Sequence, residues 1–191
     1  MIMREHSWSK KNALWMLLYV VLYVITSVIV CVLGSVHPFL FVCYQITAGL
    51  LVTGVAVKAF DRIKAFGAAV CLSLGMIITF IAMQDANLWH CVPVIVIAVL
   101  AEVIRVAFEY NEKGNMIAAV IMSFSTFGYY GQIWFNRDYT YECAVEEMPA
   151  GYADTLMNCS PVWSFPVVII IGIAVAVIIY NITKKLFGFD R

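Results

Sequence analysis

The chain has 191 residues, of which 63% are hydrophobic and 13% charged, and its formal net charge is zero. Soluble domains are about 45–50% apolar and about 25% charged, so this composition excludes a soluble domain and indicates an integral membrane protein. A mean hydropathy of +0.91 agrees with that class. The balanced charge gives no indication of a nucleic-acid partner, and none is expected.

Six apolar stretches are long enough to cross the hydrocarbon core, which takes about 20 helical residues. They are residues 13–34, 39–57, 65–83, 88–108, 115–135 and 165–183. The first is too long for a signal-peptide core and lacks a small-residue cleavage site, so we expect it to be retained. The sequence therefore predicts an all-α, polytopic membrane protein, a single integral domain over residues 1–191 with six transmembrane helices.

The basic residues predict the orientation of these helices, because Lys and Arg are retained on the cytoplasmic side of a membrane. With the N-terminus in the cytoplasm, all of the 12 basic residues except Arg137 fall in inner segments or at inner helix ends. We therefore expect a multi-pass protein of the cell membrane with both termini cytoplasmic. The long loop between the fifth and sixth helices is then extracellular.

This loop, residues 136–163, is the one long polar stretch of the chain (NRDYTYECAVEEMPAGYADTLMNCSPVW). Long loops in compact folds are usually functional. Its prolines, its glycine and its lack of apolar periodicity favour a lid that becomes ordered when a ligand is captured. We expect the pocket below it to be walled by the outer halves of the fourth, fifth and sixth helices.

The segment from Ala101-Glu102 through NRDYTYECAVEEMPAGYADTL and SPVW to the last helix resembles a known family. Together with six short-looped spans and a long outer fifth loop, it is similar to S components of energy-coupling factor (ECF) transporters, and most specifically to the Trep-Strep (MptD-like) family. The resemblance implies a subunit that captures a micronutrient from outside and is not an enzyme. Its implied partners are a membrane coupling subunit and two cytoplasmic ATPase subunits.

Two features of the chain bear on these partners. No GxxxxGK[ST] sequence is present, so ATP would have to bind to other chains. Many S components carry an Ala-xxx-Ala pattern on the first helix, but here Ala13 is followed by Leu17, which leaves the coupling surface unassigned. Small residues at the same spacing occur elsewhere, as in Gly172 and Ala176, and we expect them to pack within the bundle.

Polar side chains near the outer helix ends are the candidates for substrate binding. His37 and His90, in VHPF and LWHC, fall at similar depth and could offer neutral imidazoles to a metal-bearing ligand. Arg137 is the candidate for an anion contact, and Gln45 for a polar contact from the second helix. The alternatives are an interfacial role for each histidine, and an Arg137 that caps the fifth helix and pairs with a nearby carboxylate.

Aromatic residues of the outer half complete the predicted binding site. Tyr130, Trp134 and Trp163 could line a pocket for a flat ligand. The alternative is the aromatic belt that anchors membrane proteins at the headgroups. A vitamin-like molecule or a tetrapyrrole is the expected substrate, with heme as the most specific hypothesis, and flavin-like or thiamine-like ligands stay open. No cofactor, catalytic residue or protein metal site is expected.

Two other functions are alternatives to substrate capture. An intramembrane enzyme would need a nucleophile with a base, or clustered carboxylates or histidines, and the predicted spans contain no such cluster. A stand-alone transporter or channel is the other alternative. Secondary transporters more often show inverted repeats or broken helices with buried ionisable groups, and the sequence shows none.

Two polar pairs carry further expectations. Glu102 and Arg105 lie three residues apart near the inner end of the fourth helix and should pair. We expect Arg105 to reach the lipid headgroups, with a contact to the coupling subunit as the alternative. Cys143 and Cys159 share the outer loop and could form a disulfide. The cysteines have no zinc-type spacing.

Overall fold

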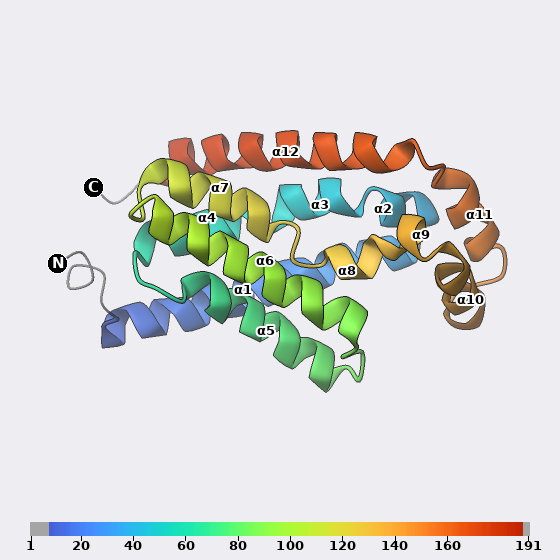
Figure 1. Cartoon of the computed structure of the whole chain (residues 1–191), viewed down its shortest axis with the longest axis horizontal. Helices are drawn as coiled ribbons and strands as arrows, with labels where there is room; N and C mark the ends of the chain where they lie inside the picture. Colours follow the sequence, from blue (N-terminus) through green and yellow to red (C-terminus); the bar gives the residue numbers. More distant parts are fainter. Residues whose placement is uncertain (1–7, 189–191) are drawn as a thin grey trace.

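The computed structural model describes residues 8–188, and over that range the chain folds into helices without a strand. Three helices are long and apolar enough to cross a membrane: α1 (Lys10–Val36), α6 (Leu88–Ala107) and α12 (Ser164–Phe187). α5 (Ala68–Ala82) is apolar but shorter. The start of α1 and the end of α12 lie at the same end of the molecule (Figure 1). The predicted all-α class is confirmed.

The second predicted apolar stretch forms three consecutive helices: α2 (Pro38–Val42), α3 (Tyr44–Leu51) and α4 (Thr53–Arg62). Val52, between α3 and α4, keeps helical dihedrals of φ −86° and ψ −37°, so these two helices follow one path. Cys43 has a ψ of 12°, outside the helical range, and interrupts the helix between α2 and α3.

The fifth predicted stretch is also divided, into α7 (Glu112–Met122), α8 (Phe127–Tyr130) and α9 (Gln132–Phe135). Residues 123–126 form turns between α7 and α8. The Ser123 hydroxyl donates to the carbonyl of Val120 at 2.7 Å, which offers the backbone an alternative to helical hydrogen bonds. The sequence predicted one continuous helix here, because the overall apolar character of residues 115–135 does not reveal the interruption.

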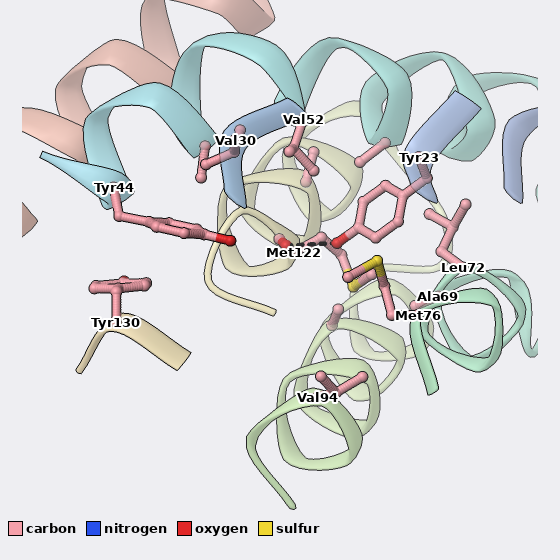
Figure 2. Close-up of a cluster of buried hydrophobic side chains, with 14 of the residues drawn as sticks. Tyr23, Val30, Tyr44, Val52, Ala69, Leu72, Met76, Val94, Met122 and Tyr130 are labelled. Carbon is pink, nitrogen blue, oxygen red and sulfur yellow. Dashed lines mark hydrogen bonds between the residues drawn. The ribbon is translucent and has the colours of Figure 1, made fainter. Parts of the chain in front are cut away.

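Side chains from other helices satisfy the polar groups that the interruption leaves free. The Tyr23 hydroxyl of α1 donates to the carbonyl of Met122 at 2.7 Å, as Figure 2 shows. Gln45 of α3 donates through Nε2 to the Ser123 hydroxyl at 3.0 Å. The Tyr130 hydroxyl donates to Gln45 Oε1. A non-helical segment inside an apolar bundle is stable when such partners are available.

The polar stretch that follows is helical rather than a loop without structure of its own. α10 (Arg137–Glu147) and α11 (Tyr152–Cys159) form a helical hairpin at the end of the molecule opposite the start of α1 (Figure 1). Gly151 enables the turn into α11 with a left-handed φ of 83°. Leu156 of α11 is fully buried. Contacts with the bundle therefore order a segment that has no apolar periodicity.

Glu102 and Arg105 form the predicted pair, but the expected position of Arg105 is wrong. Its side chain is completely buried instead of reaching outward. It donates to Glu102 at 3.3 Å, to the carbonyl of Ile63 at 2.6 Å and to Asn115 at 3.2 Å. Glu102 in turn accepts from the backbone N–H of Ala69 at 3.0 Å. The pair thus ties α6 to the α4–α5 connection and to α7.

Small residues bring α3 and α12 into close contact. A Cβ on Gly49 of α3 would lie 2.7 Å from the carbonyl oxygen of Gly172, and 3.6 Å from the Cβ of Ala176. These distances leave no room for a larger side chain on Gly49. The expectation that Gly172 and Ala176 pack within the bundle is confirmed.

Candidate functional site

A cavity of about 120 Å³ lies between the α10–α11 hairpin and the ends of the helices below it. Its walls come from the end of α1, α2, the α5–α6 connection, α6, α8, α9 and both hairpin helices. The lining residues are Ser35, Phe41, Asp85, Asn87, His90, Tyr129, Gln132, Tyr139, Thr140, Cys143, Ala144, Glu147, Met148, Tyr152 and Leu156. None of the described residues of α12 lines it, so the wall predicted from the sixth helix is wrong.

His90, in the first turn of α6, is a nearly buried polar residue of the cavity. Asn87 caps α6 by accepting from the His90 backbone N–H at 2.9 Å, which fixes the first turn. His90 Nδ1 lies 2.9 Å from the Asp85 carbonyl oxygen and 3.2 Å from an Asp85 carboxylate oxygen. Asn87 Nδ2 lies 3.1 Å from the same nitrogen. The two Asp85 oxygens outnumber this one donor and favour a proton on Nδ1. Nε2 then keeps a lone pair, and no described residue donates to it.

Aromatic rings hold this imidazole and form one wall of the cavity. The rings of His90 and Tyr129 have centroids 4.9 Å apart, and Phe80 packs on His90 at 5.7 Å. Phe41 meets Tyr129 edge to face at 5.8 Å. Phe41 and Tyr129 line the cavity, so their rings contribute apolar surface to it.

Two carboxylates, Asp85 and Glu147, line the cavity, and no Lys or Arg does. Gln132 adds a buried amide whose side chain is only 7% exposed. Its Nε2 donates to the carbonyl of Gly128 at 2.8 Å, which fixes the amide orientation and leaves Oε1 without a hydrogen-bond partner. A buried acceptor without a partner costs about 1–3 kcal/mol. A ligand that donates a hydrogen bond to Gln132 Oε1 would remove this cost.

The hairpin that roofs the cavity is fixed by two anchors. Arg137, in the first turn of α10, donates to the carbonyls of Met157 at 2.6 Å and Ser160 at 2.7 Å at the end of α11. Tyr152 of α11 donates to the carbonyl of Gly34 in α1 at 2.7 Å. Burial raises the pKa of Tyr152 to about 12, which keeps this phenol a neutral donor.

The family model described as "Hypothetical bacterial integral membrane protein (Trep_Strep)" matches residues 10–188. The chain belongs to the Trep_Strep family. The match includes every helix and every residue that lines the cavity. Membership confirms the membrane class that the composition indicated. No curated protein and no solved structure matches the chain.

In this Trep_Strep protein, three of the polar site candidates have different positions. His90 lines the cavity. His37 is exposed, and its Nδ1 accepts from the backbone N–H of Phe39 at 3.1 Å, which caps α2. Arg137 closes the hairpin and forms no ion pair with any carboxylate that the structure describes. The two outer histidines are therefore not brought together in the cavity.

The remaining candidates lie outside the cavity lining. Gln45 and Tyr130 are fully buried and hydrogen-bond to each other at the helix interruption. Trp134 donates through Nε1 to the Ser164 hydroxyl at 3.0 Å, between α9 and α12. Trp163 is 68% exposed, as expected for a residue of the aromatic belt.

Sequence reasoning missed Asp85, Gln132 and Glu147 as cavity residues. A signal for Asp85 was present, because the polar turn QDAN directly precedes LWHC and places Asp85 only five residues before His90. Gln132 follows a helix interruption that apolar periodicity does not reveal. Glu147 was one of several acidic residues in the hairpin, and only the fold selects it.

The cysteines of the Trep_Strep protein do not form the hypothesised bridge. Cys143 and Cys159 are both free thiols in the described structure. Over residues 8–188, no group of three or more His, Cys, Asp or Glu side chains is arranged to hold a metal ion. The cavity itself offers hydrogen-bond acceptors, two carboxylates and aromatic rings.

Proposed function

We propose that this protein is the substrate-binding S component of an ECF transporter and captures a small micronutrient in the cavity below α10 and α11. The cavity itself carries the proposal: it is partly enclosed by a hairpin, contains an unpartnered buried acceptor, and has polar groups converging on an aromatic wall. Such cavities are the usual form of a small-molecule site. The resemblance to the S components adds the expected context of ATP-driven uptake.

The proposal includes six membrane crossings with both termini in the cytoplasm. α1, α5, α6 and α12 supply four of them, the α2–α4 path a fifth, and α7 to α9 the sixth. The distribution of Lys and Arg supports this orientation. The hairpin lies at the opposite end from the start of α1 and the end of α12 (Figure 1), which suits an extracellular cavity.

Chemical labelling tests this topology. In a chain whose native cysteines are replaced, single cysteines at Glu146 or Asp154, both exposed on the hairpin, should react with a membrane-impermeant maleimide on intact cells. A cysteine at Lys113, exposed in the first turn of α7, should react only after permeabilisation. Labelling of Lys113→Cys but not Glu146→Cys on intact cells would invert the topology and contradict the proposal.

Transport separates an S component from a stand-alone transporter. Reconstituted alone in liposomes, the protein should bind its ligand without accumulating it, because the chain lacks a phosphate-binding loop. Addition of the coupling subunit and ATPase subunits should give uptake that needs ATP. The ligand is first identified by mass spectrometry of small molecules released from the purified protein. Steady uptake by the chain alone would overturn the proposal.

A secondary transporter is the second candidate, and the structure gives it one argument. The interruption between α7 and α8 is a broken helix of the type on which such transporters rely. However, the side chains at this interruption are uncharged and already paired: Gln45, Ser123 and Tyr130. Secondary transporters use buried ionisable residues to couple ions to substrate, and these three paired side chains carry no charge. The S component is therefore the better supported function.

The substrate proposed from the sequence was vitamin-like, with heme as the most specific hypothesis. Two observations favour the smaller molecules in that range. The cavity volume of about 120 Å³ is below the ~300–1,000 Å³ of sites for drug-sized ligands. His37 does not line the cavity, so a second outer imidazole for a heme iron is missing there.

A further inference from the structure

The carboxylates and the buried unpartnered acceptor of the cavity favour a positively charged or hydrogen-donating ligand. Asp85 and Glu147 bring two carboxylates, and neither meets a Lys or Arg among the described residues. Asp85 faces the imidazole of His90, whose Nδ1 lies 3.2 Å from its carboxylate. An anionic ligand would meet repulsion from both carboxylates without a compensating cation.

Neutral groups of the cavity point to the same chemistry. Gln132 Oε1 is a buried acceptor without a partner, and its orientation is fixed by the bond from Nε2 to Gly128. His90 Nε2 is a second free acceptor when Nδ1 holds the proton for Asp85. A ligand with N–H donors would satisfy both acceptors, whereas a ligand with only acceptors would satisfy neither.

The aromatic wall favours a cation as well. The side chains of Phe41, Tyr129 and Tyr139 line the cavity beside the carboxylates. Ring faces carry negative electrostatic potential and attract ammonium and guanidinium groups within about 6 Å. Arg137, the only Lys or Arg of residues 136–163, lines a separate surface depression with Asp138 and Glu142, so it adds no positive charge here.

We propose that the cavity selects a small organic cation that carries N–H donors, such as an ammonium or amidinium compound. The cation lies against the ring of Tyr129, its charge is balanced by Asp85 and Glu147, and its N–H groups donate to Gln132 Oε1 and His90 Nε2. This inference rests on the proposed function only in taking the cavity as the capture site. The sequence predicted that Arg137 contacts an anionic group of the ligand, whereas this inference predicts a cationic ligand.

Isosteric probes test the preference directly. Binding of guanidinium against urea, and of benzamidinium against benzamide and benzoate, is measured by calorimetry on the full chain in nanodiscs. We expect at least one of the two cations to bind at least tenfold more tightly than its neutral isostere, and benzoate not to bind. Cations that bind no better than their neutral isosteres, or do not bind, overturn the inference.

Charge-neutralising variants show which carboxylates contribute to cation binding. Glu147→Gln, at an exposed position where folding is not at risk, and Asp85→Asn should each weaken binding of the preferred cation about tenfold or more. Glu146→Gln, a neighbouring exposed carboxylate outside the cavity lining, is the matched control and should bind like the wild type. If Glu146→Gln and Glu147→Gln weaken cation binding equally, the preference would be a general effect of surface charge. The proposed site would then be wrong.

These outcomes are distinct from those of the transport experiment. If the chain alone accumulates its ligand, the S-component proposal fails while cation binding is unaffected. If the released natural ligand is neutral or anionic, the charge preference fails while ATP-driven uptake still supports the S component.

Discussion

Replacing Arg105 with Met is expected to lower the free energy of unfolding by about 3–5 kcal/mol, because Glu102 would remain buried and unpaired. The side chain of Arg105 is completely buried and donates to Glu102, to Asn115 and to carbonyls of the α4–α5 connection. Its guanidinium also lies 4.3 Å from the ring centroid of Phe60. Met fills the volume but satisfies none of these acceptors.

The measurement is unfolding of the purified protein in mixed micelles by increasing SDS, followed by circular dichroism. Arg62→Met is the matched control: Arg62 is only partly buried and lies 3.9 Å from the Trp15 ring, so its loss should cost about 1 kcal/mol or less. The double variant Arg105→Met with Glu102→Met should be more stable than Arg105→Met alone. Equal losses for both arginines would contradict the structural role assigned to Arg105.

Replacing Gly128 with Ala is expected to cost about 3 kcal/mol or more and to impair ligand capture. Pro93 has no N–H, so the carbonyl of Trp89 lacks its helical partner, and α8 approaches α6 at that point. A Cβ on Gly128 would overlap this carbonyl oxygen and lie 2.7 Å from the Pro93 ring. Because both neighbours belong to the backbone or a rigid ring, α8 itself would have to move.

Gly54→Ala in α4 is the control for this variant. Its added Cβ would meet Thr183 Oγ1 at 3.4 Å and Ile179 at 3.7 Å, which are ordinary contacts, so its stability should change by less than about 1 kcal/mol. The same SDS titration compares the two, and cation binding is measured on both. A Gly128→Ala protein as stable as Gly54→Ala would show that α8 does not pack on α6 as described.

Membrane class and most helix positions follow from the sequence alone. The stretches predicted at 88–108 and 165–183 correspond closely to α6 and α12, because long apolar runs have no stable alternative to a helix in lipid. The pairing of Glu102 with Arg105 also followed from their spacing of three residues. Such features depend on neighbours in the chain, which hydropathy and helical periodicity describe well.

Local patterns failed where distant segments determine the outcome. The interruption between α7 and α8 depends on Tyr23 and Gln45, which are remote in sequence and supply its hydrogen bonds. The hairpin is helical because Leu156 and Tyr152 meet the bundle, and its own composition predicted a flexible lid. Arg105 is buried because carbonyls of another connection converge on it.

The candidate site, too, could be predicted only in part from the sequence. His90 could be selected from the sequence, since a histidine next to a polar turn at a helix start is recognisable. Its alignment with Tyr129, Gln132 and Glu147 was decided only by the tertiary structure, which joins the start of α6, the broken fifth stretch and the hairpin. The sequence determined that this is an apolar helical membrane protein with one long acidic segment. Packing between remote segments decided that two of its carboxylates share a cavity, because charge and shape complementarity arise only when those segments meet.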